Sequence, residues 1–212
     1  MSERYNVAAS AVLGENYKIT NIEASDYNPS IDDSITLTIT VTDVYGDAIS
    51  DESVTVTASE GTFTQLNGSD ITSASSVTGT TNSSGEFTLT YSCTHWGLIT
   101  FTANNKSTQV SVTGWKLIGA YASDKITLYS DGKLGMVTIG GTWSHSTTGE
   151  QVLATINSEY TPFSNVSTNY SYGENAHQAV YTKGTNICIN RSGTGNVGIY
   201  CTLYFRLATP KY

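Results

Sequence analysis

Aromatic and imidazole side chains gather in two stretches that are otherwise rich in Ser, Thr, Asn and Gly, "WSHSTTGEQ" and "NVSTNYSYGENAHQ". An aromatic ring offers a flat apolar face to a sugar ring, and Asn, Ser and His side chains satisfy the surrounding hydroxyl groups. Tyr, Ser, Gly and Asn also dominate antibody binding loops, where they supply contact area at low entropic cost. The two stretches therefore predict a ligand-binding surface. Its candidate residues are Trp143, His145, Tyr170, Tyr172 and His177.

A different interpretation of these tyrosines stays open. Large aromatic side chains with a polar tip also pack subunit interfaces and domain cores. The same residues could therefore bury a contact between copies of the chain or fill the core of one domain.

The sequence shows no pattern typical of catalysis or metal binding. His95, His145 and His177 have no second histidine two or four residues away, so no zinc-type spacing occurs. Glu150 and Glu159 could form a carboxylate pair for glycoside cleavage, but they flank one expected strand, and solvated side chains are the favoured interpretation. No nucleophile-elbow or phosphate-binding motif occurs. We therefore expect no enzyme activity, no cofactor and no metal ion.

Acidic residues in the first half are of the type that binds calcium. Ca²⁺ prefers several oxygen ligands, but the spacing here matches no EF-hand loop. We expect these carboxylates to lie in solvated loops. They are Asp26, Asp32, Asp33, Asp43, Asp47 and Asp51.

Charge is scarce and unevenly distributed. Charged residues make up 13% of the chain and the net charge is −8, which argues against a nucleic-acid partner because phosphate binding needs clustered Lys and Arg. Residues 1–114 carry 13 Asp/Glu and 3 Lys/Arg, whereas residues 115–212 carry 5 and 7. This asymmetry indicates two domains with different roles.

No apolar run reaches the roughly 18 residues of a membrane span, so membrane insertion is not expected. The opening residues "MSERYNVAASAVLGEN" lack the apolar core of a secretory signal. Residues 1–15 are expected to be a linker or a leftover segment. The chain then either leaves the cell by another route, such as lysis, or is a piece of a longer protein.

Three cysteines do not make a disulfide framework. Cys188 and Cys201 lie in two apolar runs joined by a Gly-rich turn, so they could face each other across a hairpin, and whether they are bonded stays open. Cys93 has no evident partner and is expected to be a small buried apolar residue.

Strands dominate the first half. In "SITLTITVTD" (34–43), Ile35, Leu37, Ile39 and Val41 alternate with threonines, which predicts one buried and one wet face. "SVTVTAS" and "GEFTLTYSC" repeat the pattern, and Gly- and Asn-containing turns separate such runs. About seven short strands predict an immunoglobulin-like sandwich over residues 16–114.

The second half, residues 115–212, is also predicted to be all-β and carries nine of the 14 tyrosines. In "LATINSEYTPFSNV", Leu153 and Ile156 are expected to finish an inward-facing strand, and Pro162 stops the ladder because it lacks an N–H donor. We expect this corner to redirect the chain to the other sheet or to a neighbouring subunit. Tyr160 is expected at a partly solvent-exposed position. An ordinary proline turn is the alternative.

The terminal strand of this half, "IYCTLYFRL", is apolar on both faces. Such a strand is unfavourable at a free surface, which suggests that it is covered by another copy of the chain. On one face lie Ile199, Cys201, Leu203 and Phe205, and on the other Tyr200, Thr202 and Tyr204.

Residues 19–113 resemble a bacterial Ig-like domain of the invasin/intimin type. The resemblance rests on "DYNPSIDDSITLTITVTDVYGDAISDESVTV", "TNSSGEFTLTY" and "GLITFTA". It implies a rigid spacer that holds another domain away from a surface.

Residues 115–212 resemble the C-terminal head of phage or archaeal-virus tail-tip and tail-fibre proteins. The matching segments occur in the family's order, although Asn157 stands where a proline is usual and Thr161 where an arginine is. The resemblance implies a jelly-roll-like β-sandwich, a homotrimer and a receptor-binding role. The segments are "GKLGMVTIGG", "LATINSEYTPFSNV", "QAVYTKGTNICINRSG" and "GIYCTLYFRL".

These observations predict a receptor-binding adhesin on a virion tail, extracellular when it acts, that attaches to a host cell-envelope glycan or surface protein. The alternatives are a cellular surface adhesin, a carbohydrate-binding module of a larger secreted protein, and a glycan-cleaving enzyme.

Overall fold

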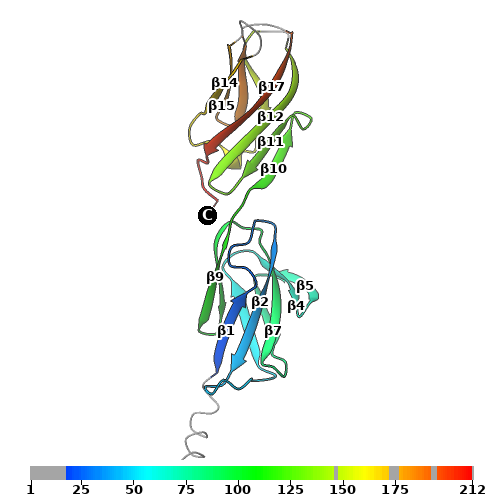
Figure 1. The fold of residues 1–212 in the computed structure, drawn as a ribbon, viewed down its shortest axis with the longest axis vertical. Coiled ribbons are helices and arrows are strands. Elements are labelled where there is room, and N and C mark those ends of the chain that lie inside the picture. Colours follow the sequence, from blue (N-terminus) through cyan, green and yellow to red (C-terminus); the bar gives the residue numbers. More distant parts are fainter. Residues whose placement is uncertain (1–17, 146–147, 172–176, 192–194, 212) are drawn as a thin grey trace, which may run out of the picture. The chain divides into compact units, whose positions relative to one another are not determined.

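The computed structural model describes residues 18–145, 148–171, 177–191 and 195–211. The chain divides into two compact units, unit 1 (Met1–Thr113) and unit 2 (Gly114–Tyr212). Both are built from antiparallel sheets, as Figure 1 shows. Apart from the 3-10 turn η1 (Ser158–Tyr160), the described residues contain no helix, which confirms the predicted all-β class.

Unit 1 is a sandwich of two sheets with the strand orders β1-β2-β7-β4-β5 and β6-β3-β8-β9, an arrangement of the immunoglobulin-like type. Tight turns with positive φ join several strands, as at Asn67 and Gly68 between β4 and β5. The strands are β1 (Ile19–Ala24), β2 (Ser34–Thr42), β3 (Ser53–Ala58), β4 (Thr62–Leu66), β5 (Ser69–Ala74), β6 (Ser76–Thr80), β7 (Glu86–Ser92), β8 (Gly97–Ala103) and β9 (Lys106–Val112).

The predicted alternation in β2 is confirmed. Ile35 is 2% exposed, and Leu37, Ile39 and Val41 are fully buried. The strand pairs with β7 so that Leu37 lies opposite Leu89, and the two strands therefore present one continuous apolar face to the core.

Three aromatic rings form the centre of the unit 1 core. The ring centroids of Tyr91 and Phe101 lie 4.8 Å apart in a T-shaped contact, and Phe63 lies 5.9 Å from Tyr91. The Tyr91 hydroxyl donates a 2.8 Å hydrogen bond to the carbonyl of Glu60, so the buried ring does not leave a polar group unpaired.

Unit 2 is a second sandwich, with the strand orders β10-β11-β12-β17 and β13-β16-β15-β14. β17 lies at the edge of the first sheet and pairs with β12 over twelve residues, from Leu134 opposite Arg206 to His145 opposite Gly195. The strands are β10 (Lys116–Tyr121), β11 (Ile126–Ser130), β12 (Leu134–His145), β13 (Gly149–Thr155), β14 (Ser167–Ser171), β15 (His177–Lys183), β16 (Asn186–Arg191) and β17 (Gly195–Arg206).

The inward faces of the two sheets make one hydrophobic core, and β17 contributes one of its two faces to it. Ile199, Leu203 and Phe205 are at most 4% exposed. On the other face, Tyr200 is 67% and Tyr204 62% exposed. This outward aromatic face is the feature of unit 2 that its own core does not explain.

The proline corner follows the expected local structure. Leu153 and Ile156 are buried, Tyr160 is half-buried, and Pro162 makes only an isolated bridge with Leu207 at the end of β17. Asn157 caps the 3-10 turn, because its side-chain oxygen accepts from the Glu159 N–H at 2.9 Å.

The expected transfer of the chain to the other sheet is wrong. β13 enters the corner and β14 leaves it, and both are edge strands of one sheet, separated by β16 and β15. The corner instead crosses the end of that sheet and touches β17 of the other, where the Phe163 N–H donates to the Arg206 carbonyl at 2.8 Å. Local signals predict a turn, but the partner of the next strand is a non-local choice.

The hairpin expected to carry Cys188 and Cys201 does not form, because β16 and β17 belong to different sheets. All three cysteines are free thiols. Cys93 is fully buried, and burial, followed by the nearby Asp33 and Asp26, raises the pKa of its thiol to about 11.

Candidate functional site

Strand direction brings most of the predicted site residues to one end of unit 2. β12 ends there at His145, β13 begins at Gly149 opposite Arg191, and Ser171 at the end of β14 pairs with His177 at the start of β15. We refer to this end, made by residues 141–145, 148–150, 169–171, 177–179, 189–191 and 195–199, as the ribbon end. It is the end nearer the β14 label in Figure 1.

The ribbon end takes its name from β12 and β17. The paired residues of β11 and β12 stop at Ile126 opposite Ile139, whereas β12 and β17 continue as a pair to His145. Gly141, with φ +148, lies where this two-stranded extension begins, and a Cβ there would meet the Lys125 side chain at 3.0 Å. Glycine therefore allows the lysine to lie against the ribbon.

Trp143 is the candidate residue whose side chain the structure describes. It is half-buried and packs against the unit 2 core. The Lys125 ammonium lies 5.2 Å from the centroid of its ring and donates to the Thr142 carbonyl at 2.7 Å. This is cation–π geometry, which orients the ring. Trp143 thus belongs partly to the core. This agrees, for Trp143, with the alternative interpretation that these aromatic residues fill a domain core.

The indole N–H of Trp143 is buried and meets no hydrogen-bond acceptor in the structure as described. A buried donor without a partner costs free energy that a water molecule or a ligand oxygen could recover. The indole N–H therefore adds a polar feature to the Trp143 surface that sequence reasoning did not identify.

The other candidates are placed through their backbones. His145, Tyr170 and His177 lie on β12, β14 and β15, all at the ribbon end. Tyr172 lies outside the described residues. The structure thus brings four of the five predicted residues to one end of one sandwich, although they are as far as 34 positions apart in the sequence.

Arg191 is a ribbon-end residue that the sequence interpretation missed. It is 6% exposed, and one of its terminal nitrogens donates to the Gly195 carbonyl at 2.8 Å. This bond ties the end of β16 to the start of β17, across the two sheets. The sequence signal is a lone arginine that ends the apolar run "NICINR".

The carboxylate pair considered for catalysis is separated in the structure. Glu150 accepts hydrogen bonds from Tyr181 (2.6 Å) and Lys183 (2.8 Å) at the start of β13, whereas Glu159 pairs with Lys211 beyond the far end of that strand. A strand rises about 3.3 Å per residue, so the length of β13 keeps the two apart by roughly 20 Å. That is far more than the separation glycosidases use.

A second surface lies at the other end of β17. A groove of about 330 Å³ is lined mainly by Leu134, Phe163, Val166, Tyr204 and Phe205. Phe163 is 71% exposed and Tyr204 62% exposed. This groove and Tyr200 make an apolar strip along an edge strand, which is the type of surface that soluble chains usually cover.

Among the described residues, no group of three or more His, Cys, Asp or Glu side chains is placed to hold a metal ion. The acidic loops of unit 1 instead bond to their own backbone. Asp43, for example, accepts from the N–H groups of Tyr45 (2.8 Å) and Asp47 (2.9 Å). No helix in the described part of the chain is long and apolar enough to span a membrane.

Fold and site together define a chain of two β-sandwich units, the second of which carries the candidate site.

A comparison with protein-family models finds no match, and a comparison with curated protein sequences finds none either. Among solved structures, the Yersinia pseudotuberculosis adhesin InvE is 11% identical, with 92% of this chain and 61% of that chain covered and a TM-score of 0.40. Domains 4 and 5 of the S-layer protein SbsC are 22% identical, with 45% and 51% covered and a TM-score of 0.28.

A second SbsC structure, of domains 5–6, is 14% identical over 86% of this chain and 97% of that chain, with a TM-score of 0.30. The chain spans 51% and 61% of the lengths of the SbsC domain 4–5 and InvE structures. At TM-scores below 0.5, no function is carried over from these structures.

Proposed function

We propose that this chain is a receptor-binding adhesin of a virion tail, in which unit 1 is a spacer and unit 2 is the head that attaches to a host cell-envelope glycan. The observation that carries the proposal is the convergence of Trp143, His145, Tyr170 and His177 at the ribbon end. These are aromatic and imidazole residues on three strands, next to Ser- and Asn-rich sequence, and they are of the types that stack on a sugar ring and bond its hydroxyl groups. The resemblance of unit 2 to tail-fibre heads points the same way.

The head acts as a homotrimer in this proposal. The exposed Tyr200, Tyr204 and Phe163 beside an apolar groove supply a surface that a second copy would bury. Three sites presented together raise the apparent affinity of a weak sugar site by roughly 10²–10⁴ without new contacts. A weak site at each ribbon end would therefore suffice for attachment.

Binding of the fluorescently labelled chain to a panel of candidate host cells, with and without enzymatic removal of surface glycans, tests the function. We expect binding to one host type and its loss after glycan removal.

The double variant Tyr170→Ala with Tyr172→Ala should weaken this binding. Tyr45→Ala is the control: it removes a tyrosine that is 70% exposed on unit 1 and should leave binding unchanged. Unchanged binding by the double variant would refute the glycan site. If binding is lost after protease treatment of the cells and not after glycan removal, the receptor is a protein.

Light scattering at micromolar concentration tests the trimer. We expect a trimeric mass, and we expect Phe163→Lys with Tyr204→Lys to give monomers because the charges oppose burial of the strip. A monomeric mass for the unmodified chain would contradict the trimer while leaving the ribbon-end site to be judged by cell binding.

A cellular surface adhesin or a carbohydrate-binding module of a larger secreted protein would use the same ribbon end. A parent gene among tail genes favours the virion, whereas a signal peptide and wall anchor in the parent gene favour the cell surface. The proposal includes no enzyme activity, so incubation with host envelopes should release no sugar.

A further inference from the structure

Backbone hydrogen bonds join the segment that follows β1 to the end of β9. The carbonyls of Tyr27 and Pro29 accept from the N–H groups of Ser111 (2.9 Å) and Thr113 (3.0 Å), and the Ile31 N–H donates to the Thr113 carbonyl (2.6 Å). A bridge between Ser30 and Thr113 shows that the two segments run parallel. Thr113 is also the last residue of unit 1.

Parallel pairing has a mechanical consequence. β1 begins at Ile19, beside the β8–β9 turn that holds Asn104, and β9 ends next to residues 29–31. The chain therefore enters unit 1 at one end of the sandwich and leaves at the other, as the course of β1 and β9 in Figure 1 shows. Tension along the chain would slide residues 27–31 and 111–113 past each other. All three bonds would then be strained together instead of breaking one after another.

We propose that residues 27–31 and 111–113 form a shear clamp that keeps unit 1 folded when the chain is under tension. The function goes beyond attachment, because it concerns what unit 1 does once unit 2 is held at a surface. The proposal depends on the position of the bonds and not on which ligand unit 2 binds.

The clamp lies on buried apolar side chains. Pro29 is buried, Ile31 is 7% exposed and Val112 is fully buried. Buried contacts on the inner side restrict access of water, which would otherwise compete for the backbone groups as the strands begin to slide. The Asp32 N–H and Asp33 carbonyl also bond the backbone of Cys93, at 2.8 and 2.9 Å, and so attach the same segment to the end of β7.

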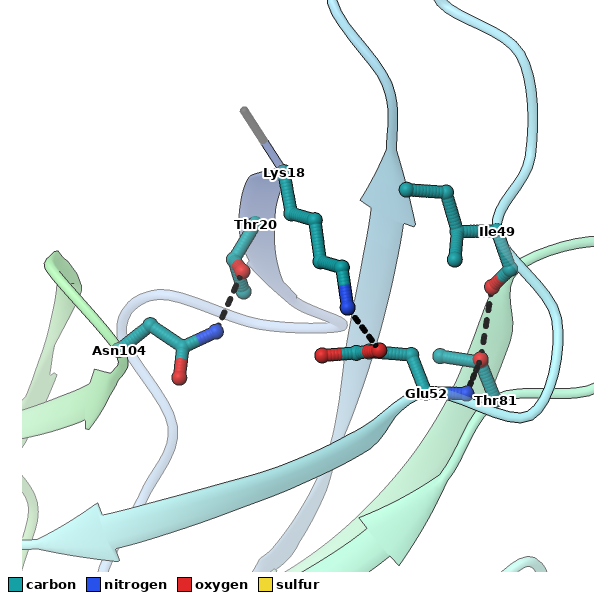
Figure 2. Close-up of polar contacts among 6 residues, drawn as sticks. All are labelled: Lys18, Thr20, Ile49, Glu52, Thr81 and Asn104. Atoms are coloured by element: carbon teal, nitrogen blue, oxygen red, sulfur yellow. Dashed lines mark hydrogen bonds and ion pairs between the residues drawn. The ribbon is translucent and has the colours of Figure 1, made fainter. Parts of the chain in front are cut away.

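The start of β1 is fastened at the opposite end of unit 1, and Figure 2 shows the contacts of Lys18 and Thr20 there. The Thr20 hydroxyl, on a residue only 3% exposed, accepts from the Asn104 amide at 2.9 Å. The Lys18 ammonium lies 2.5 Å from the Glu52 carboxylate. The ion pair is partly exposed and contributes little, but the Thr20–Asn104 bond connects β1 to the facing sheet. Force applied at Lys18 is therefore passed to both sheets.

Single-molecule pulling of the full chain tests the clamp. One handle is placed before Lys18 and the other on a short labelling tag inserted between Gly114 and Trp115, so that force crosses unit 1 alone. Complete opening of residues 18–113 releases about 340 Å of chain at roughly 3.5 Å per residue, which identifies the event.

Ser111→Pro and Thr113→Pro each remove one donor of the clamp. Thr72→Pro, at an exposed position of edge strand β5, is the matched control because it lies in neither terminal segment. We expect each clamp variant to unfold roughly two- to tenfold faster than the unmodified chain at constant force. The control should stay close to the unmodified rate under force, even where it lowers stability in denaturant by the same amount.

Two results would overturn the clamp. One is an unchanged unfolding rate under force in both clamp variants, and the other is an equal acceleration by Thr72→Pro at matched stability in denaturant. Thr113 is exposed, so its variant keeps the test valid if Ser111→Pro does not fold. Cell binding of the same variants separates the two proposals, because the clamp can fail while attachment through unit 2 remains.

Discussion

Tyr181 and Glu150 change each other's titration on the surface of unit 2. The Tyr181 hydroxyl donates to Glu150, and this bond, followed by burial, raises the pKa of the phenol from 10.0 to about 12. The hydrogen bonds from Lys183 and Tyr181 hold the pKa of the Glu150 carboxyl below its ordinary value. Glu150 is thus a structural acceptor in this arrangement, which is how a solvated carboxylate near a cation behaves.

Glu150→Gln should return the pKa of Tyr181 toward 10, because the substitution removes the negative charge that disfavours the phenolate. A ring-carbon NMR titration, assigned with Tyr181→Phe, measures this shift. A Tyr181 pKa still near 12 in Glu150→Gln would show that the carboxylate is not the cause.

The raised pKa of Tyr181 also determines how the stability of the fold changes with pH. The folded pKa of Tyr181 is raised, so the stabilisation is complete below the unfolded pKa near 10 and is lost as pH rises through about 12. The lowered pKa of Glu150 acts in the opposite range: its stabilisation is present above the unfolded carboxyl pKa and is lost as pH falls through the folded one.

At the scale of elements, Thr81 joins the segment before β3 to the one after β6. Its hydroxyl donates to the Ile49 carbonyl at 2.7 Å and accepts from the Glu52 N–H at 2.9 Å, as Figure 2 shows. Its own backbone N–H donates to the Glu52 carbonyl at 2.9 Å. Thr81 is 2% exposed, so a lost partner would not be replaced by bulk water.

Thr81→Val keeps the shape of the side chain and removes the hydroxyl. We expect unit 1 to lose about 1–3 kcal/mol, because two partly buried backbone groups, the Ile49 carbonyl and the Glu52 N–H, would lose their side-chain partner. Thr55→Val is the matched control: its hydroxyl pairs with Thr78 at an exposed position, and its effect should stay within about 0.5 kcal/mol. Denaturant unfolding measures both, and equal effects would contradict the buried role of Thr81.

Strand identity and facing were predictable because they depend on neighbours in the sequence. The alternation in β2 gave Leu37 and Ile39 as core residues. That in β17 placed Leu203 and Tyr204 on opposite faces, and the structure shows that the Leu203 face is the buried one. Strand partners were not predictable in the same way. The Gly-rich segment after Arg191 resembles a hairpin turn, yet β17 pairs with β12, because pairing is decided by burial over the whole sandwich.

The candidate site shows the same limit. The residue types around Trp143 and Tyr170 indicated a binding surface, but their convergence follows from the directions of β12 and β14, which only the topology supplies. Arg191 was missed because one arginine in an apolar run has no spacing pattern. Its bond to Gly195 exists only once β16 and β17 are placed.

At the scale of the whole molecule, the chain divides between Thr113 and Gly114. The sequence marked this place by the change in charge balance and by Gly114 followed by Trp115. The buried residues that form the hydrophobic core of unit 2 run from Ile126 to Leu207. Each unit therefore has the hydrophobic core that an independently folding domain needs.

Fragments of the two units should separate the proposed roles. We expect residues 114–212 alone to form trimers and bind host cells, because both the ribbon end and the apolar strip belong to unit 2. Residues 16–113 alone should be monomeric and should not bind. Each fragment should melt within a few degrees of its transition in the full chain, and Thr81→Val should shift only the unit 1 transition.

Calorimetry of the full chain and both fragments measures these transitions, and light scattering and cell binding measure the roles. If unit 2 needs unit 1 to fold or to assemble, its fragment will show no separate transition, and the assignment of attachment to unit 2 alone is then wrong. If the unit 1 fragment binds cells, its exposed Tyr45 and Leu98 become the receptor surface to examine, since they are 70% and 60% exposed. The physical basis of the expected result is that the apolar area buried within a domain is the main source of its free energy of folding.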